Sequence, residues 1–94
     1  MKKAVRYFRL AADQGDAVAQ FSLGGCYANN VGVSKDMKET VRYYQLAADQ
    51  ESATAQSNLG VCYTNDDGVP KDMKIAVRYY WLAADQGDAV AQVS

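Results

Sequence analysis

The chain contains no histidine, so it lacks the commonest general base near neutral pH and the commonest zinc ligand. It also lacks a Ser–His–Asp or Cys–His arrangement, a C-x-x-C pair and a phosphate-binding G-x-x-x-x-G-K motif. The segment Asp66-Asp67-Gly68 faintly resembles a calcium loop, but the other ligand positions are missing, so we interpret it as a solvated turn. The sequence therefore predicts no enzyme, no catalytic residue, no cofactor and no metal site.

An excess of charge of either sign is also absent. Ten Lys and Arg residues are mixed with eleven Asp and Glu residues, whereas nucleic-acid binding needs basic residues clustered on one face. No apolar run approaches the roughly 20 residues that span a bilayer, and residues 1–9 lack the apolar core of a signal peptide. We expect neither a nucleic-acid partner nor a membrane partner, and the sequence predicts no particular compartment.

Internal repetition is what the sequence does contain. The segment Val-Arg-Tyr occurs at 5–7, 41–43 and 77–79, always 36 residues apart. The segment Leu-Ala-Ala-Asp-Gln occurs at the same offset, at 10–14, 46–50 and 82–86. A fixed period of this size indicates a repeat architecture. We predict one repeat domain, residues 1–94, with about two and a half repeats: partial repeat 1–15, repeats 16–51 and 52–87, and partial repeat 88–94.

Each repeat is predicted to hold two helices, at about 36–50 and about 52–65 in the best-defined copy. Their apolar residues recur at spacings of three and four, the helical period: Met37, Val41, Tyr44 and Ala48, then Ala55, Leu59, Cys62 and Tyr63. Asp36 is a good N-cap, and Glu39 is placed to complete a capping box. No segment alternates as a strand does, so the fold class is all-α.

Three glycine positions carry conformational predictions. Gly15 stands where a helix end favours a left-handed residue. Glu51 replaces it in the next repeat, so we expect a local adjustment or about 1 kcal/mol of strain. Gly24 and Gly60 lie inside helices, where glycine costs about 1 kcal/mol relative to alanine, which predicts close helix contact there.

The two cysteines, Cys26 and Cys62, occupy the same position in successive repeats. Equivalent helices lie about 9 Å apart or more, whereas a disulfide needs Cα atoms within about 7 Å. We therefore expect two free thiols that act as small buried residues.

The repeat resembles the Sel1-like repeat, a relative of the tetratricopeptide repeat, over essentially the whole chain. The matching residues are Tyr43, Ala47, Ala48, Ala55, Gln56, Leu59, Gly60, Tyr63, Gly68, Val69 and Asp72. The resemblance implies a right-handed α/α superhelical solenoid of antiparallel helix pairs. It also implies a concave face that binds a protein or peptide.

Comparison of the repeats separates fixed positions from varied positions on one helix. The fixed stripe, Ala19, Leu23 and Cys26, is predicted to pack the solenoid. The varied positions form a second stripe, which we expect to face solvent: Val18, Phe21, Ser22, Gly25, Ala28, Thr54, Ser57, Asn58, Val61 and Thr64. The resemblance puts this helix on the concave face, so these are the predicted partner-binding residues. Free drift of an exposed surface would give the same pattern.

Trp81, the only tryptophan, is either a hot-spot anchor or a cover over the C-terminal end of the stack, and we favour the cover. The predicted function is a non-catalytic protein-protein interaction scaffold or adaptor. The alternative is a structural, self-associating repeat array, or a fragment of one, with no specific ligand. Because both ends of the stack are expected to expose apolar faces, we also predict end-to-end homo-oligomers.

Overall fold

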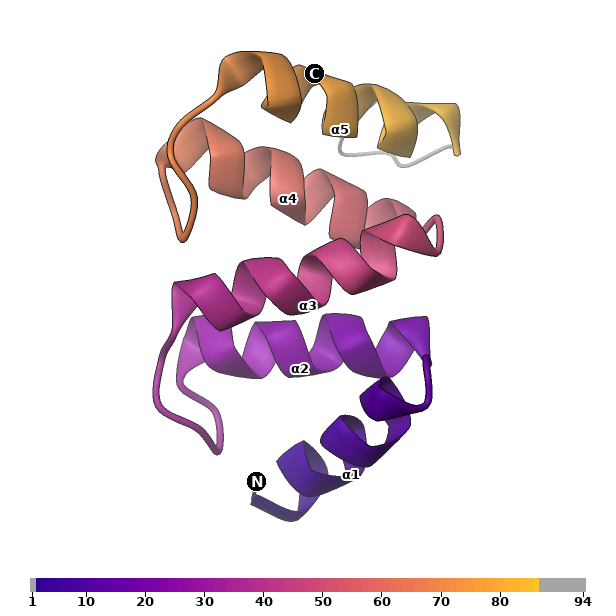
Figure 1. The fold of residues 1–94 in the computed structure, drawn as a ribbon, viewed down its shortest axis with the longest axis vertical. Helices are drawn as coiled ribbons and strands as arrows, with labels where there is room; N and C mark the ends of the chain where they lie inside the picture. The colour runs from indigo at the N-terminus through magenta and orange to yellow at the C-terminus, as the bar shows by residue number, and fades with distance from the viewer. Residues whose placement is uncertain (1, 87–94) are drawn as a thin grey trace.

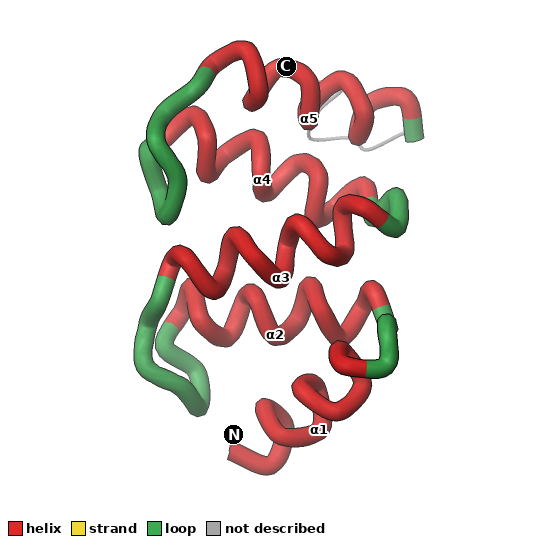
Figure 2. Tube along the Cα trace, viewed as in Figure 1, coloured by secondary structure: helices red, strands yellow, loops and turns green. Residues whose placement is uncertain are grey.

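The computed structural model describes residues 2–86, and the predicted partial repeat 88–94 lies outside them. The described residues form five helices: α1 Lys2–Asp13, α2 Ala17–Asn29, α3 Met37–Asp49, α4 Ala53–Asn65 and α5 Met73–Asp85. The helices stack in chain order along the long axis, with short turns at one side and longer loops at the other (Figures 1 and 2). No strand occurs in residues 2–86, and the architecture is the predicted all-α solenoid.

The N-terminus of α3 begins at the predicted cap, but the capping box is only half formed. The Asp36 carboxylate accepts a hydrogen bond from the backbone N–H of Glu39 at 3.3 Å. The backbone N–H of Asp36 donates to the Tyr27 carbonyl oxygen at 3.0 Å, so it is not available to Glu39. The Glu39 carboxylate instead accepts from Arg42 at 2.8 Å.

The short turns before α2 and α4 have the same backbone geometry despite their different residues. Gly15 has φ 92° and Glu51 has φ 66°, both in the left-handed region. The backbone N–H of each donates to the carbonyl oxygen three residues back, Ala12 or Ala48, at 2.9 Å. The backbone of this turn is the same with Glu51 as with Gly15. Of the two predicted outcomes, the structure therefore shows the strained one, at a cost of about 1 kcal/mol.

The two glycines inside helices lie against tyrosine rings of the following helix. A Cβ atom at residue 24 would lie 2.7 Å from the ring of Tyr44, and one at residue 60 would lie 2.7 Å from the ring of Tyr80. Any larger residue at either position would require the tyrosine ring or the helix to shift. The predicted close contact is confirmed, and it explains why glycine recurs at this offset.

Helix α3 is buried on two sides, which the predicted single stripe did not anticipate. Thr40, Tyr43 and Ala47 are buried, although the predicted stripe omitted them, whereas Met37 and Val41 are only half-buried. The reason is that α3 lies between α2 and α4 and contributes to both core clusters. A helix with neighbours on two sides buries two stripes.

Hydrogen bonds between glutamine side chains link successive repeats. The side-chain amide of Gln20 donates to the Ala12 carbonyl oxygen at 3.2 Å, and the Gln20 oxygen accepts from Gln50 at 2.8 Å. One repeat later, the oxygen of Gln56 accepts from Gln86 at 2.7 Å. Gln20 and Gln56 are both buried, and these hydrogen bonds give their side-chain amides partners inside the stack.

Both thiols are free and buried, as predicted. Burial raises the pKa of the Cys26 thiol and the pKa of the Cys62 thiol above their ordinary value. The raised values favour the neutral thiol, so both residues serve as small packing groups.

Candidate protein-interaction surfaces

The fixed stripe and the varied stripe of α2 and α4 differ in burial. Leu23 and Leu59, at one fixed position, are both 0% exposed. Val18, Thr54 and Val61 are exposed. The other varied positions are half-buried, except one that is buried: Phe21, Ser22, Gly25, Ala28, Asn58 and Thr64 are half-buried, and Ser57 is buried. The expectation that the varied stripe faces solvent is therefore wrong for Ser57.

Phe21 and Ser57 occupy equivalent positions that serve helix packing. The Phe21 ring stacks on the Tyr44 ring, with centroids 5.2 Å apart. Ser57 is 7% exposed, and its hydroxyl oxygen has no hydrogen-bond partner within the described part of the chain. Both positions are therefore treated as packing sites. The remaining varied residues form what we call the α2–α4 face: Val18, Ser22, Gly25, Ala28, Thr54, Asn58, Val61 and Thr64.

Helices α2 and α4 both pack against α3 and contribute to one core cluster. Ala17 and Phe21 of α2 pack against a core cluster that includes Ala55 and Leu59 of α4. The two halves of the α2–α4 face thus belong to neighbouring layers of the same stack.

The α2–α4 face changes in polarity between its two helices. On α4, the Asn58 amide donates to the Thr54 carbonyl oxygen at 3.0 Å, and the Thr64 hydroxyl donates to the Gly60 carbonyl oxygen at 2.8 Å. These bonds hold the polar side chains against their own helix. On α2 the face is mostly apolar, and its most exposed residue is Val18.

Trp81 lies on α5 and is 66% exposed, so most of its ring covers none of the described residues. Met73, Val77 and Trp81 are spaced by four residues and are all exposed, and we call them the α5 stripe. The equivalent residue Val41 on α3 instead lies against the loop that contains Gly68. One repeat earlier, the equivalents of Met73 and Val77 therefore lie against a following loop.

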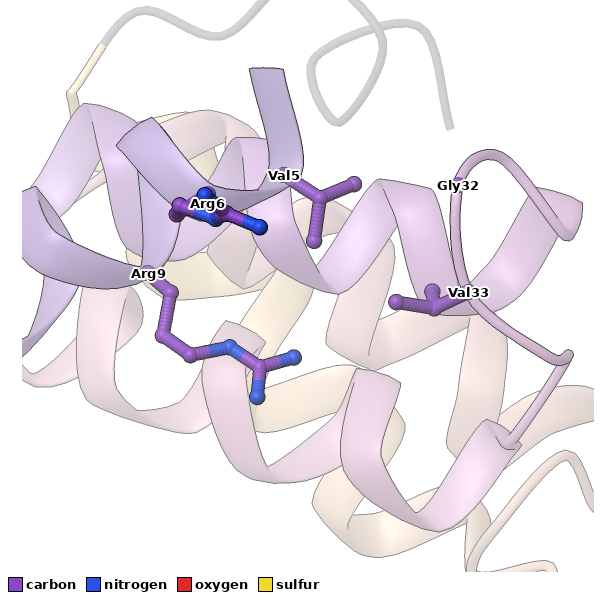
Figure 3. Close-up of a pocket in the computed structure, with 5 residues that line it drawn as sticks. All are labelled: Val5, Arg6, Arg9, Gly32 and Val33. Atoms are coloured by element: carbon purple, nitrogen blue, oxygen red, sulfur yellow. The ribbon is translucent and has the colours of Figure 1, made fainter. Parts of the chain in front are cut away.

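A hollow of about 330 Å³ lies between α1 and the loop that follows α2 (Figure 3). It is lined by Val5, Arg6, Arg9, Gly32 and Val33. The Arg9 guanidinium donates to the Tyr27 hydroxyl at 2.8 Å. Sequence reasoning missed this hollow, although Lys3, Arg6 and Arg9 recur at a spacing of three along α1.

The acidic residues and the cysteines are the residue types in this chain that could form a metal site. No group of three or more His, Cys, Asp or Glu residues is placed to hold a metal ion within residues 2–86. Asp66 has φ 60° at the end of α4, and its carboxylate accepts from the Lys71 backbone N–H at 3.1 Å. This carboxylate therefore stabilises a turn. None of the helices in the described part combines the length and apolar character that a membrane-spanning helix needs.

The Sel1 repeat family model matches residues 1–16, 17–52 and 53–88. No curated protein matches the chain in sequence. Several solved structures do match, and three of them show the same fold.

A Sel1 repeat protein from Oxalobacter formigenes is 40% identical over 97% of this chain, with a TM-score of 0.90. A protective antigen of uropathogenic Escherichia coli strains, which displays an SLR fold, is 36% identical over 96% of this chain, with a TM-score of 0.94. Cysteine-rich protein B of Helicobacter pylori is 26% identical over 93%, with a TM-score of 0.89. The chain spans 37%, 19% and 65% of these proteins, respectively. With three family matches and this shared fold, the chain belongs to the Sel1 repeat family.

Proposed function

We propose that this chain is a non-catalytic scaffold that binds a protein or peptide through the α2–α4 face, the concave face in the family's architecture. Sel1 repeat proteins are generally protein-interaction scaffolds without catalytic activity. The supporting observation is that the same two helices carry buried, repeated residues and exposed, varied residues. Leu23 and Leu59 are identical and fully buried, whereas Val18 and Thr54 are exposed and different.

The composition of the α2–α4 face suits a peptide-like partner. Val18 and Val61 are 75% and 40% exposed, so they offer apolar area that a partner would remove from water. Thr54 and Asn58 supply polar groups beside them. The face lies on helices whose opposite sides are packed in the core. Binding therefore orders few additional residues of this chain, and the entropic cost of binding is lower than for a flexible loop.

A double variant tests the proposal. Val18→Glu with Val61→Glu places two charges on the α2–α4 face, and we expect partner affinity to fall at least about tenfold. The matched control is Leu46→Glu with Leu82→Glu, which makes the same change at exposed leucines of α3 and α5. Partners captured by the wild type are identified by quantitative mass spectrometry, and each affinity is then measured by calorimetry. Equal losses in both double variants would contradict the proposal.

The self-associating array is the second candidate, and exposed apolar residues at the two outer helices of the described stack favour it. Trp81 and Val77 are exposed on α5, and Tyr7 and Leu10 are 69% and 61% exposed on α1. Exposed apolar patches of a few hundred Å² tend to find partners. Light scattering over a concentration series tests this candidate: a mass that rises with concentration, and falls back in Trp81→Glu, supports it, whereas a monomer at every concentration excludes it.

A further inference from the structure

We propose that the hollow between α1 and the loop after α2 binds a carboxylate side chain of an acidic peptide segment in the partner. Arg6 and Arg9 would hold the carboxylate. This inference rests on the proposed scaffold function and names part of the partner's chemistry.

The first argument is a comparison of the same three positions in successive repeats. In α1 the positions are Lys3, Arg6 and Arg9, in α3 they are Glu39, Arg42 and Gln45, and in α5 they are Ile75, Arg78 and Trp81. Only α1 carries a basic residue at all three. Among the described residues, the structure contains no ion pair to Arg6 or Arg9.

The second argument is that the α3 copy already holds a carboxylate. The Glu39 Oε2 atom accepts from Arg42 Nη2 at 2.8 Å and from Arg42 Nε at 3.2 Å. Charge-assisted hydrogen bonds of this kind are among the stronger ones in proteins. At the equivalent place in α1 the acid is replaced by Lys3, so the positive charge of Arg6 is reinforced instead of neutralised. A carboxylate from outside would take the role that Glu39 has in α3.

The third argument is that the hollow is more than a charged surface. The Val5 side chain is 5% exposed, and Val33 is half-buried on the facing loop, so two walls are apolar (Figure 3). Arg6 and Arg9 are exposed, so these apolar walls contribute surface for the methylene groups of an acidic side chain. Arg9 is oriented by its bond to Tyr27, which in turn stacks on Tyr43 with centroids 6.0 Å apart. Part of the entropy that an exposed ion pair loses is therefore already lost before binding.

The test is a titration of the ¹⁵N-labelled chain with a capped tetraglutamate peptide, followed by NMR, with capped tetraglutamine as the control. We expect saturable shifts of the Nε–H signals of Arg6 and Arg9 and of the backbone amides of Gly32 and Val33. Tetraglutamine should leave them unchanged. Arg9→Gln should weaken tetraglutamate binding about tenfold, whereas Arg78→Gln, at an equivalent helix, should have no effect.

A substitution that adds a carboxylate next to Arg6 tests the proposal more directly. Lys3→Glu recreates the Glu39–Arg42 arrangement on α1, so an internal carboxylate should occupy Arg6 and abolish tetraglutamate binding. Lys74→Glu changes the net charge equally at a distant exposed position and is the matched control. If both variants weakened tetraglutamate binding equally, the effect would come from the net charge of the chain, and the proposal would be overturned.

Other outcomes also decide the matter. Shifts of the Arg42 and Arg78 signals as large as those of Arg6 would overturn the proposal, as would larger shifts with inorganic phosphate than with tetraglutamate. Partner binding that is lost in Val18→Glu/Val61→Glu but unchanged in Arg9→Gln would overturn this inference and leave the scaffold function standing. Binding that the Val18→Glu/Val61→Glu change does not affect would overturn the scaffold proposal, while the peptide titration still tests the hollow.

Discussion

The α2–α3 interface and the α4–α5 interface share one contact and differ in what surrounds it. In each interface a helix glycine lies against the ring of a tyrosine, Gly24 against Tyr44 and Gly60 against Tyr80. The Tyr44 ring is 8% exposed, whereas Tyr80 is half-buried. The glycine–tyrosine contact therefore sets the distance between the helices, and the residues around it set how firmly they are held.

The surrounding residues contribute different contacts, and we expect the first interface to be the stronger one. The Thr40 hydroxyl donates to the Gly24 carbonyl oxygen at 3.0 Å, and Ala76 at the equivalent position has no hydroxyl to donate. Phe21 stacks on Tyr44, and its counterpart Ser57 is a buried hydroxyl without a described partner. The repeat thus tolerates loss of stabilising contacts as long as the backbone approach is kept.

The largest expected effect is loss of the aromatic contact in the first interface. Phe21→Ala removes a half-buried ring that packs on Tyr44, and we expect the free energy of unfolding to fall by about 2 kcal/mol. Val18→Ala, at an exposed position of the same helix, should change it by less than about 0.5 kcal/mol. Urea denaturation followed by circular dichroism measures both. Equal effects would mean that Phe21 contributes no packing.

The glycine contact should respond differently in the two interfaces. Gly24→Ala gains about 1 kcal/mol of helix propensity but places a Cβ against a buried ring, an overpacking cost of about 1 to 3 kcal/mol. We expect a net loss of about 1 kcal/mol. Gly60→Ala should be close to neutral, because the half-buried Tyr80 ring has room to move. Calorimetric melting of both variants checks the order, and a larger loss in Gly60→Ala would reverse the comparison.

Removal of a hydroxyl should have opposite signs in the two interfaces. Thr40→Val deletes a bonded hydroxyl and leaves the Gly24 carbonyl oxygen without that donor, so stability should fall by about 1 kcal/mol. Ser57→Ala deletes a hydroxyl that is buried without a described partner, so stability should rise by about 1 kcal/mol. Denaturant midpoints of the two variants give the signs, and destabilisation in both would show that Ser57 has a partner.

The smallest effect is expected at the turns that precede the interfaces. Glu51→Gly removes the left-handed strain of an L-residue but adds unfolded-chain entropy, for a net gain of about 0.5 kcal/mol. Gly15→Glu, the reverse change at the equivalent turn, should lower stability. Melting temperatures that move in the same direction would contradict the equivalence of the two turns.

The sequence predicted the features that depend on local chemistry. Asp36 caps its helix, Gly15 takes a positive φ, and Gly24 makes a close helix contact, because each of these follows from one residue and its neighbours in the chain. The 36-residue period predicted the stack, since equivalent residues make equivalent contacts.

The features that the sequence did not predict depend on neighbours far apart in the chain. The burial of Thr40 follows from the position of α3 between two helices, which a single apolar stripe does not reveal. Ser57 was placed with the exposed residues because its type varies, but variation also occurs at packing sites. The hollow depends on the direction of the Arg9 side chain, which is set by the hydroxyl of Tyr27 on another helix.

Site-specific photo-crosslinking tests the partner-binding role of the α2–α4 face most directly. A photoreactive amino acid is placed in turn at Val18, Val61, Leu46 and Leu82, which are all exposed apolar positions. The scaffold account predicts that the partner is crosslinked from residues 18 and 61 and not from residues 46 and 82. Crosslinking from residues 46 and 82 alone, or equally from all four, would contradict it.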